Sequence, residues 1–483
     1  MKRTIHLFLL AAFFVLFLQS LIAQQSKVWT LEECINYALE HNINIQQEAL
    51  NVNYQEELLL QSKLGILPNI NGYASHGYNW GQRVDPFTNE FATDRVRTNN
   101  IYLQGDLNLF NGLQQVNTIK RNLLNLQAAQ LDVDYFKDEI SIAVATEYLQ
   151  TLYYMEFVTI ARNQLEITNQ QVERTSKLVN AGTLAKGDLL TIEAQQASEE
   201  LSLVTAENNL ALAYLNLTQL LELHTTEGFE IEKPELGLIE QPEIFTPDKI
   251  YSVAVTDRPE IKSAEMKVES SEKSLSIAKG AYYPRLSLSG SLGSGYSGAN
   301  VVGTNPIYEE QEFGYWYTDD PVNPTVPVYG ITQGFESYNA KKFGDQLNDN
   351  LNESIGLSLS IPIFNGWSSR SQVAQAKIGI ASANLDLELQ KNNLYKVIQQ
   401  AYNDAVAAFN KHKAATKKVN ATSESFKYAE QKFNVGLINS VEYNDAKKEY
   451  NNALAESIQA KFDFVFRTTV IDFYLGKPLT LKR

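Results

Sequence analysis

Two long stretches of the chain carry apolar residues at helical spacing and almost nothing that breaks a helix. Residues 113–181 contain neither glycine nor proline, so the backbone can continue as one helix of ~100 Å. Residues 367–435 are interrupted only by Gly379 and predict a second helix of the same length. Apolar residues recur at steps of three and four in the first stretch, and such a stripe is typical of a packed helix. In the first stretch they include Ile140, Val144, Tyr148, Leu152, Met155 and Val158.

Both long stretches lie between the same two motifs. A Phe-Asn-Gly motif precedes each one, at Phe110–Gly112 and Phe364–Gly366, and a glycine closes each one, at Gly182 and Gly436. The two occurrences of each motif are separated by the same number of residues. Earlier in the chain, corresponding residues are separated by a smaller number: Thr30 and Thr246, Ala38 and Ala254, and Pro68 and Pro284. The chain is therefore an internal duplication. The second copy holds extra residues between Pro284 and Phe364.

Shorter helices precede and follow each long one. Residues 30–66 and 247–280 predict helices of ~50 Å that lead into strands, and the first has a capping box from Thr30 to Glu33. Residues 188–227 and 437–475 predict returning helices of ~60 Å. One helix that leads into a strand and one returning helix, stacked end to end, have about the length of one long helix. In each copy we therefore expect these two shorter helices to lie along the long helix and form a rod with it.

The hydrophobic period changes to two between Pro68 and Phe110. Strands are predicted near residues 70–80 and 98–110, around a polar loop that contains Asp85. In the second copy, alternating apolar residues at 286–292 and 355–363 predict two more strands. Strands of ~10 residues with one apolar face are typical of membrane barrels. A half-buried sheet in a soluble protein gives the same alternation.

Aromatic residues lie near the ends of these predicted strands, where interfacial girdles of a membrane barrel would be. They are Tyr73, Tyr78, Trp80, Tyr102, Phe110, Tyr282, Tyr283 and Phe364. Because a membrane barrel needs at least about eight strands, four strands per chain cannot close one without other copies. The extra residues of the second copy, 299–350, contain several prolines and the cluster Tyr315–Tyr317. We expect a long loop outside the barrel that packs on itself, the alternative being contact with a ligand or partner.

The N-terminus has the pattern of a secretory signal peptide, with Lys2 and Arg3 before an apolar run that ends near Ala23. A membrane anchor is the alternative, but the run is shorter than the ~20 residues of a span. The formal net charge of −15 becomes more negative when this segment is removed, which argues against nucleic-acid binding. The single cysteine, Cys34, excludes an intrachain disulfide and is expected to be buried in a helix.

Enzyme chemistry finds no support in the sequence. The five histidines are scattered without metal-ligand spacing. Residues 293–298 match G-x-G-x-x-G, but a proline-rich segment follows where a dinucleotide-binding helix is required. We therefore predict no catalytic residue, no cofactor and no metal site.

Acidic residues gather after the second closing glycine. Glu442, Asp445, Glu449 and Glu456 share one face of the predicted returning helix. A solvated helix face explains such a cluster in an acidic protein, and an acidic functional surface is the other reading.

The chain resembles the TolC-like outer-membrane efflux proteins over essentially its whole mature length. The resemblance rests on the tandem repeat, on the motifs Leu107–Gly112 and Ile361–Gly366, and on the tips Asn180–Leu184 and Asn434–Ile438. It implies a mainly α protein with a membrane β-barrel portion. In such proteins tandem-repeat α-helical hairpins form a periplasmic tunnel, and four strands per subunit contribute to a twelve-stranded barrel of a homotrimer in outer-membrane lipid.

The resemblance also implies functional positions at the tips. The adaptor-docking residues would be Gly182, Thr183 and Leu184 in the first tip and Gly436, Leu437 and Ile438 in the second. They would bind a periplasmic adaptor (membrane fusion protein) that is linked to an inner-membrane pump. The periplasmic aperture would be lined by Asp188, Glu442 and Asp445. Ile438 and Phe433 replace an Arg and a Tyr of well-known members, so the polar network that closes the aperture is not expected intact.

These expectations define the domains and the function. Residues 1–23 are the signal peptide, 24–227 the first repeat, 228–244 a connector, and 245–483 the second repeat with an extracellular loop at 299–350. The function expected is an outer-membrane channel of a tripartite efflux or type I secretion system that conducts substrates passively. A soluble periplasmic coiled-coil scaffold or adaptor protein is the alternative.

Overall fold

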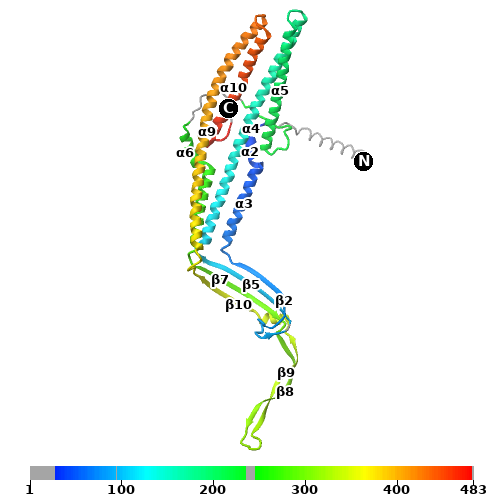
Figure 1. Ribbon diagram of the computed structural model, residues 1–483, viewed down its shortest axis with the longest axis vertical. Helices are drawn as coiled ribbons and strands as arrows, with labels where there is room; N and C mark the ends of the chain where they lie inside the picture. The colour runs from blue at the N-terminus through cyan, green and yellow to red at the C-terminus, as the bar shows by residue number, and fades with distance from the viewer. Residues whose placement is uncertain (1–27, 94, 235–244, 481–483) are drawn as a thin grey trace, which may run out of the picture. The chain divides into compact units, whose positions relative to one another are not determined.

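The computed structural model describes residues 28–93, 95–234 and 245–480 (Figure 1). The expected signal peptide, 1–23, lies outside the described residues, and so do residues 235–244 of the expected connector. The described residues form two compact units. A helical unit contains residues up to Glu57, Asn122–Ser271, and the chain from Gly379 onward, and a sheet unit contains Leu58–Arg121 and Glu272–Ile378.

Corresponding helices of the two copies have equal lengths. The first copy contains α2 (Leu31–His41), α3 (Ile43–Leu64), α4 (Gln114–Asn180) and α5 (Lys186–Leu220). The second contains α6 (Pro247–Asp257), α7 (Pro259–Gly280), α9 (Ser368–Asn434) and α10 (Ser440–Tyr474). The long helices α4 and α9 have 67 residues each, and the returning helices α5 and α10 have 35 each. The duplication and the two long helices are confirmed.

The prediction of single helices at residues 30–66 and 247–280 was wrong, because each is divided in two. Asn42 and Arg258 have extended backbone between the two parts, with ψ of 126° and 131°. Pro259 disfavours helical geometry at the residue before it, which accounts for the break at Arg258. Asn42 accepts a hydrogen bond from the Asn44 amide through Oδ1 (3.0 Å), a local alternative to helical pairing. The predicted capping box between Thr30 and Glu33 is present.

The core of the helical unit consists of two apolar clusters. One surrounds Tyr148 and Leu152 of α4 and includes Cys34, which is buried in α2 as expected. The Tyr148 hydroxyl donates to the Glu232 carbonyl oxygen (2.7 Å), which fixes a short parallel pairing of β1 (Val28–Trp29) with β6 (Glu230–Ile231) over this core. The second cluster joins α6 and α7 to α9 and α10 around Ile250 and Ile398.

Four antiparallel strands form the main sheet of the sheet unit, in the order β10-β7-β5-β2 (Figure 1). They are β2 (Asn69–Asn79), β5 (Val96–Asn111), β7 (Arg285–Ser297) and β10 (Asn352–Ser360). The predicted strands are confirmed, although β10 ends two residues before Pro362 and excludes Ile361 and Ile363. β5 and β7 join the two copies in one sheet, and β2 and β10 each have one edge that is unpaired among the described residues.

Apolar side chains on this sheet are exposed in the single chain. All eight aromatic residues expected at strand ends are among the exposed side chains. Ile101, Leu103, Ile355 and Leu357 are exposed as well, which agrees with strands that meet lipid on one face. No helix in the described ranges combines the length and apolar character needed to cross a membrane.

The Phe-Asn-Gly motifs are tight connections that require glycine. Gly112 and Gly366 have φ of +66° and +62°, a region that other residues rarely adopt. Gly112 also packs against the Gly280 backbone, and a side-chain carbon there would overlap the Gly280 carbonyl oxygen and lie 2.9 Å from Tyr283 Cβ. A side-chain carbon at Gly366 would have no neighbour within 4 Å. Packing therefore excludes a side chain at Gly112 but not at Gly366, where only the backbone conformation requires glycine.

The segment 299–350 is not the self-packed loop that was expected. It forms a hairpin of β8 (Val301–Tyr317) and β9 (Thr325–Ala340), followed by α8 (Phe343–Asp349). Many of its large apolar side chains are exposed, so self-packing was also wrong. The prolines misled the prediction because Pro306 and Pro327 lie within strands that have a free edge, where a missing N–H is tolerated.

Candidate functional site

The two helical hairpins reverse direction through the same turn. Gly182 and Gly436, with φ of +75° and +76°, follow α4 and α9. The amide of the next residue reaches back to an unpaired helix carbonyl in each turn: Thr183 to Leu178 (3.0 Å) and Leu437 to Lys432 (2.9 Å). This is the Schellman geometry that ends helices at a left-handed glycine. Both predicted tips are therefore turns fixed by backbone hydrogen bonds.

Apolar side chains cover these turns without a core beneath them. Leu437 is 74% exposed and Val435 is 71% exposed, while Ile438 and Leu184 are half-buried. Thr183 is exposed, and its hydroxyl donates to the Leu178 carbonyl oxygen (2.9 Å). The six residues predicted for adaptor docking thus lie at the two turns, where an apolar surface is accessible.

Two of the predicted aperture acids, Asp188 and Glu442, lie in the first turns of the returning helices. Asp188 of α5 accepts a hydrogen bond from the Ser440 hydroxyl (3.1 Å), which brings it beside the start of α10. Glu442 is exposed and accepts from Asn439 Nδ2 (3.1 Å), and Asp445 is exposed one turn further on. A carboxylate near a helix N-terminus is stabilised by the helix dipole. This local stabilisation accounts for Asp188 and Glu442 without reference to any aperture.

A buried ion pair that the sequence analysis missed connects the two helical hairpins. Lys447 of α10 is only 1% exposed. Its Nζ lies 3.2 Å from Glu199 Oε1 on α5 and 2.5 Å from the Thr168 hydroxyl on α4. Thr168 in turn donates to Glu199 Oε2, and Gln195 Nε2 donates to Glu199 Oε1 (2.9 Å). We call Lys447, Glu199 and Thr168 the Lys447 cluster.

Burial decides the electrostatics of the Lys447 cluster. Loss of hydration lowers the pKa of Lys447, although attraction to the nearby Glu199 carboxylate opposes that change. The pair is enclosed by three helices and its charged atoms are hydrogen-bonded, which is the condition for a buried ion pair to persist. The sequence contained one signal for it, because Lys447 lies four residues after buried Tyr443, within the apolar stripe of the returning helix.

Two further contacts surround the tips. Arg174 Nη1 of α4 donates to Asn434 Oδ1 at the end of α9 (2.5 Å), which joins the hairpins again. Phe433 stacks on Tyr443, with ring centroids 4.7 Å apart, within the second hairpin. At Phe433 the second hairpin therefore has apolar packing.

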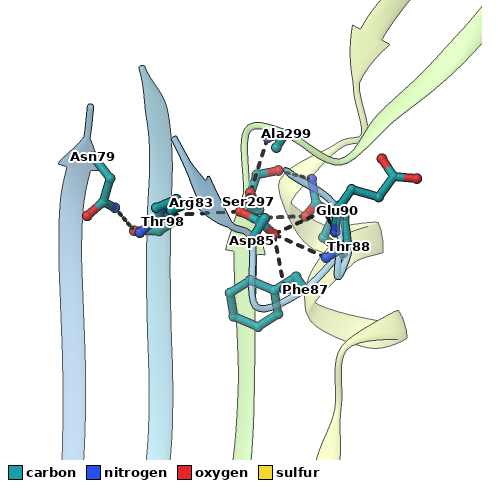
Figure 2. Close-up of polar contacts among 10 residues, drawn as sticks. Asn79, Arg83, Asp85, Phe87, Thr88, Glu90, Thr98, Ser297 and Ala299 are labelled. Atoms are coloured by element: carbon teal, nitrogen blue, oxygen red, sulfur yellow. Dashed lines mark hydrogen bonds and ion pairs between the residues drawn. The ribbon is translucent and has the colours of Figure 1, made fainter. Parts of the chain in front are cut away.

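A second buried polar cluster lies in the sheet unit, in the loop between β3 (Arg83–Val84) and β4 (Phe91–Ala92) (Figure 2). Asp85 is fully buried; Oδ1 accepts from the amides of Phe87 (3.0 Å) and Thr88 (3.1 Å), and Oδ2 accepts from the Ser297 hydroxyl (2.5 Å). Gln346 of α8 is also fully buried. Its Oε1 accepts a hydrogen bond from the Ser297 amide (3.0 Å), and its Nε2 donates to the Ser297 carbonyl oxygen (2.9 Å). This Asp85 cluster fastens a loop of the first copy, the end of β7, and α8 to one another.

Known proteins resemble this chain along most of its length. The family described as outer membrane efflux protein matches residues 34–222 and 250–465. The outer membrane protein TolC of Escherichia coli (strain K12) is 22% identical over 93% of this chain and 83% of its own length. The alkaline protease secretion protein AprF of Pseudomonas aeruginosa is 18% identical over 86% and 77%. The crystal structure of the Campylobacter jejuni CmeC outer membrane channel superposes with a TM-score of 0.72, at 14% identity, over 94% of this chain and 87% of that one.

We predict that Lys447→Met destabilises the helical unit by ~3–5 kcal/mol, because it leaves the Glu199 side chain buried without its partner. The double variant Lys447→Met with Glu199→Gln is expected to recover most of that loss, since it leaves no buried charge. Thermal unfolding followed by circular dichroism measures both effects.

The matched control is Lys448→Met, since that neighbouring lysine is exposed and its substitution should change the unfolding temperature little. If Lys447→Met is no worse than Lys448→Met, the buried pair does not join the hairpins as described.

Proposed function

Because the chain belongs to the outer membrane efflux protein family, we propose that three copies form a channel of a tripartite efflux or type I secretion system. The channel conducts exported molecules passively from an inner-membrane pump and a periplasmic adaptor to the outside, without catalysis of its own. The protein is located in the outer membrane, with its helical portion in the periplasm. The observation that carries the proposal is a four-stranded sheet with exposed apolar side chains and, among the described residues, an unpaired edge on β2 and another on β10.

The free edges require other copies of the chain. Unpaired N–H and C=O groups of β2 and β10 cannot remain in lipid, where no water is present to bind them. Pairing β2 of one copy with β10 of the next satisfies both edges and extends the sheet by four strands. Three copies give about twelve strands, within the range of closed membrane barrels. The number three is taken from the family.

The first test concerns assembly and conduction. Purified in detergent, the protein is expected to be a stable trimer with strand and helix signals together in circular dichroism, and to give conducting steps in a planar bilayer. Cell fractionation should recover it with the outer membrane. A monomer in detergent that keeps its strands, or a protein confined to the soluble periplasmic fraction, would favour a periplasmic scaffold or adaptor instead.

The aperture is the second element of the proposal. In a trimer, Asp188, Glu442 and Asp445 would each occur three times around one axis, and Glu442 and Asp445 are free of salt bridges among the described residues. A ring of carboxylates attracts cations and repels anions. Because the like charges repel one another, closure would depend on apolar packing, as at Phe433 and Tyr443, and on bound cations.

We expect Glu442→Gln with Asp445→Asn to lower cation selectivity and to weaken block by divalent cations in planar-bilayer recordings, most clearly at low salt, where screening is weak. The control is Glu166→Gln with Glu200→Gln, which removes the same charge from exposed positions in the first hairpin. Wild-type selectivity and divalent block in the test variant would mean that these acids form only a solvated face.

Adaptor docking is the third element. The two turns present Leu184, Leu437 and Ile438 at the ends of rods that have no core beneath them, and exposed apolar surface of this kind marks interaction sites. The turn glycines, Gly182 and Gly436, hold these side chains in a fixed geometry.

A photo-crosslinker placed at Thr183 should capture a periplasmic adaptor in cells, and Leu437→Asp with Ile438→Asp should abolish that capture because charge replaces the apolar contact. The trimer should remain intact. Leu201→Asp with Val204→Asp, exposed apolar positions of α5 away from the turn, should leave the capture unchanged. Undiminished crosslinking in the tip variant would refute docking at this surface.

A further inference from the structure

No further strand pairs with the β8–β9 hairpin in the part of the chain that the structure describes. Its strands are 17 and 16 residues long and pair only with each other. A two-stranded hairpin is marginally stable in water without further packing. Its outer N–H and C=O groups form a template to which another extended chain can add.

The hairpin is fixed at its root. Ser297, held by the Asp85 cluster (Figure 2), lies just before β8, and the Lys341 amide, just after β9, donates to the Asn300 carbonyl oxygen (2.8 Å). Gln346 Nε2 donates to the Lys341 carbonyl oxygen as well (2.9 Å). These bonds define where the hairpin leaves the sheet, and beyond that point most residues of β8 and β9 are exposed among the described residues.

Chain order assigns the hairpin to the outer side of the membrane. β7 begins after α7, on the side of the helices, and ends at Ser297, where the hairpin begins. A strand that crosses the membrane from a periplasmic helix therefore delivers β8 and β9 outside the cell. This step rests on the proposed function.

The charge of the hairpin is entirely negative. No lysine or arginine occurs between Arg285 and Lys341. Six exposed carboxylates occur there: Glu309, Glu310 and Glu312 on β8, Asp319 and Asp320 in the turn, and Glu336 on β9. None of the six takes part in a salt bridge of the described residues. The hairpin thus presents uncompensated negative charge, concentrated on β8.

Aromatic rings lie among these carboxylates. Tyr308, Phe313, Tyr315, Trp316, Tyr317 and Tyr329 are exposed. The strand register places Glu312 directly opposite Tyr329, so a carboxylate and a ring share one face. Carboxylates pair with lysine and arginine, and ring faces attract the same cations.

We propose that the hairpin binds an extended, lysine- or arginine-rich polypeptide segment outside the cell, which adds as a third strand along β8. The free edge supplies main-chain hydrogen bonds, and the carboxylates and rings select basic side chains. A second copy of the hairpin is the competing occupant, but it would bring like charges together, which destabilises strand pairing.

The test measures binding of a fluorescent peptide to the full-length protein in detergent by fluorescence polarisation. The probe alternates lysine and valine over about a dozen residues, the length of a long strand. Binding should be saturable and should weaken with salt. A glutamate–valine peptide, and a lysine peptide with prolines that prevent strand pairing, should not bind. Equal binding of the proline-containing peptide would overturn strand addition.

Substitution locates the site. Glu309→Gln, Glu310→Gln and Glu312→Gln together should weaken binding about tenfold, the combined effect of three exposed ion pairs. The control triple variant, Glu56→Gln, Glu57→Gln and Glu166→Gln, removes equal charge from exposed helix positions and should bind like wild type. If both triple variants lose affinity equally, the peptide senses only net charge and the site is not on β8.

Replacing residues 301–340 by a short glycine–serine linker separates this inference from the channel proposal. Peptide binding should disappear while the trimer and its conductance persist. Loss of the trimer in this variant would show that the hairpin binds other copies and would overturn the proposal. Absence of a trimer in the unaltered protein would instead count against the channel.

Discussion

Backbone N–H and C=O groups that enter lipid must find partners within protein. Among the described residues, the main sheet leaves two rows of these groups unpaired, one on β2 and one on β10. This constraint links the parts of the molecule. Only Gly112 and Leu113 separate the end of β5 at Asn111 from the start of α4 at Gln114. Since β5 and β10 lead through the turns at Gly112 and Gly366 into α4 and α9, the trimer proposed above would join its strands and its long helices through these same connections.

The sequence predicted those features that follow from a residue pattern repeated over many positions. The 67-residue helices and the alternating strands follow from residue spacing, and equal lengths follow from duplication. Three features escaped because single contacts decide them. Asn42 and Pro259 divide helices by local backbone chemistry, Pro306 fits a strand only because one edge is free, and Lys447 is buried because Glu199, far away in sequence, meets it.

The candidate site was predicted only in part. The tip turns followed from Gly182 and Gly436, which the structure shows as left-handed residues. The environment of Asp188 did not follow, because Ser440, which donates to it, belongs to the other copy. The Asp85 cluster likewise combines a loop of the first copy with Ser297 and Gln346 of the second. Contacts between the two repeats of the chain depend on tertiary packing, and the spacing of residues within each repeat does not predict them.

The Lys447 cluster also distinguishes the two copies of the duplication. α5 and α10 correspond residue for residue, so that Glu193 takes the place of Lys447, and Ala453 takes the place of Glu199. Lys447 of the second hairpin can therefore pair with Glu199 of the first. The equivalent pair with the hairpins exchanged cannot form, because it would join Glu193 to Ala453. In the trimer proposed above, hairpins of one backbone design would form the ring, but this ion pair would join only the two hairpins within each subunit. Their side chains would therefore leave threefold symmetry where the backbones alone approach sixfold.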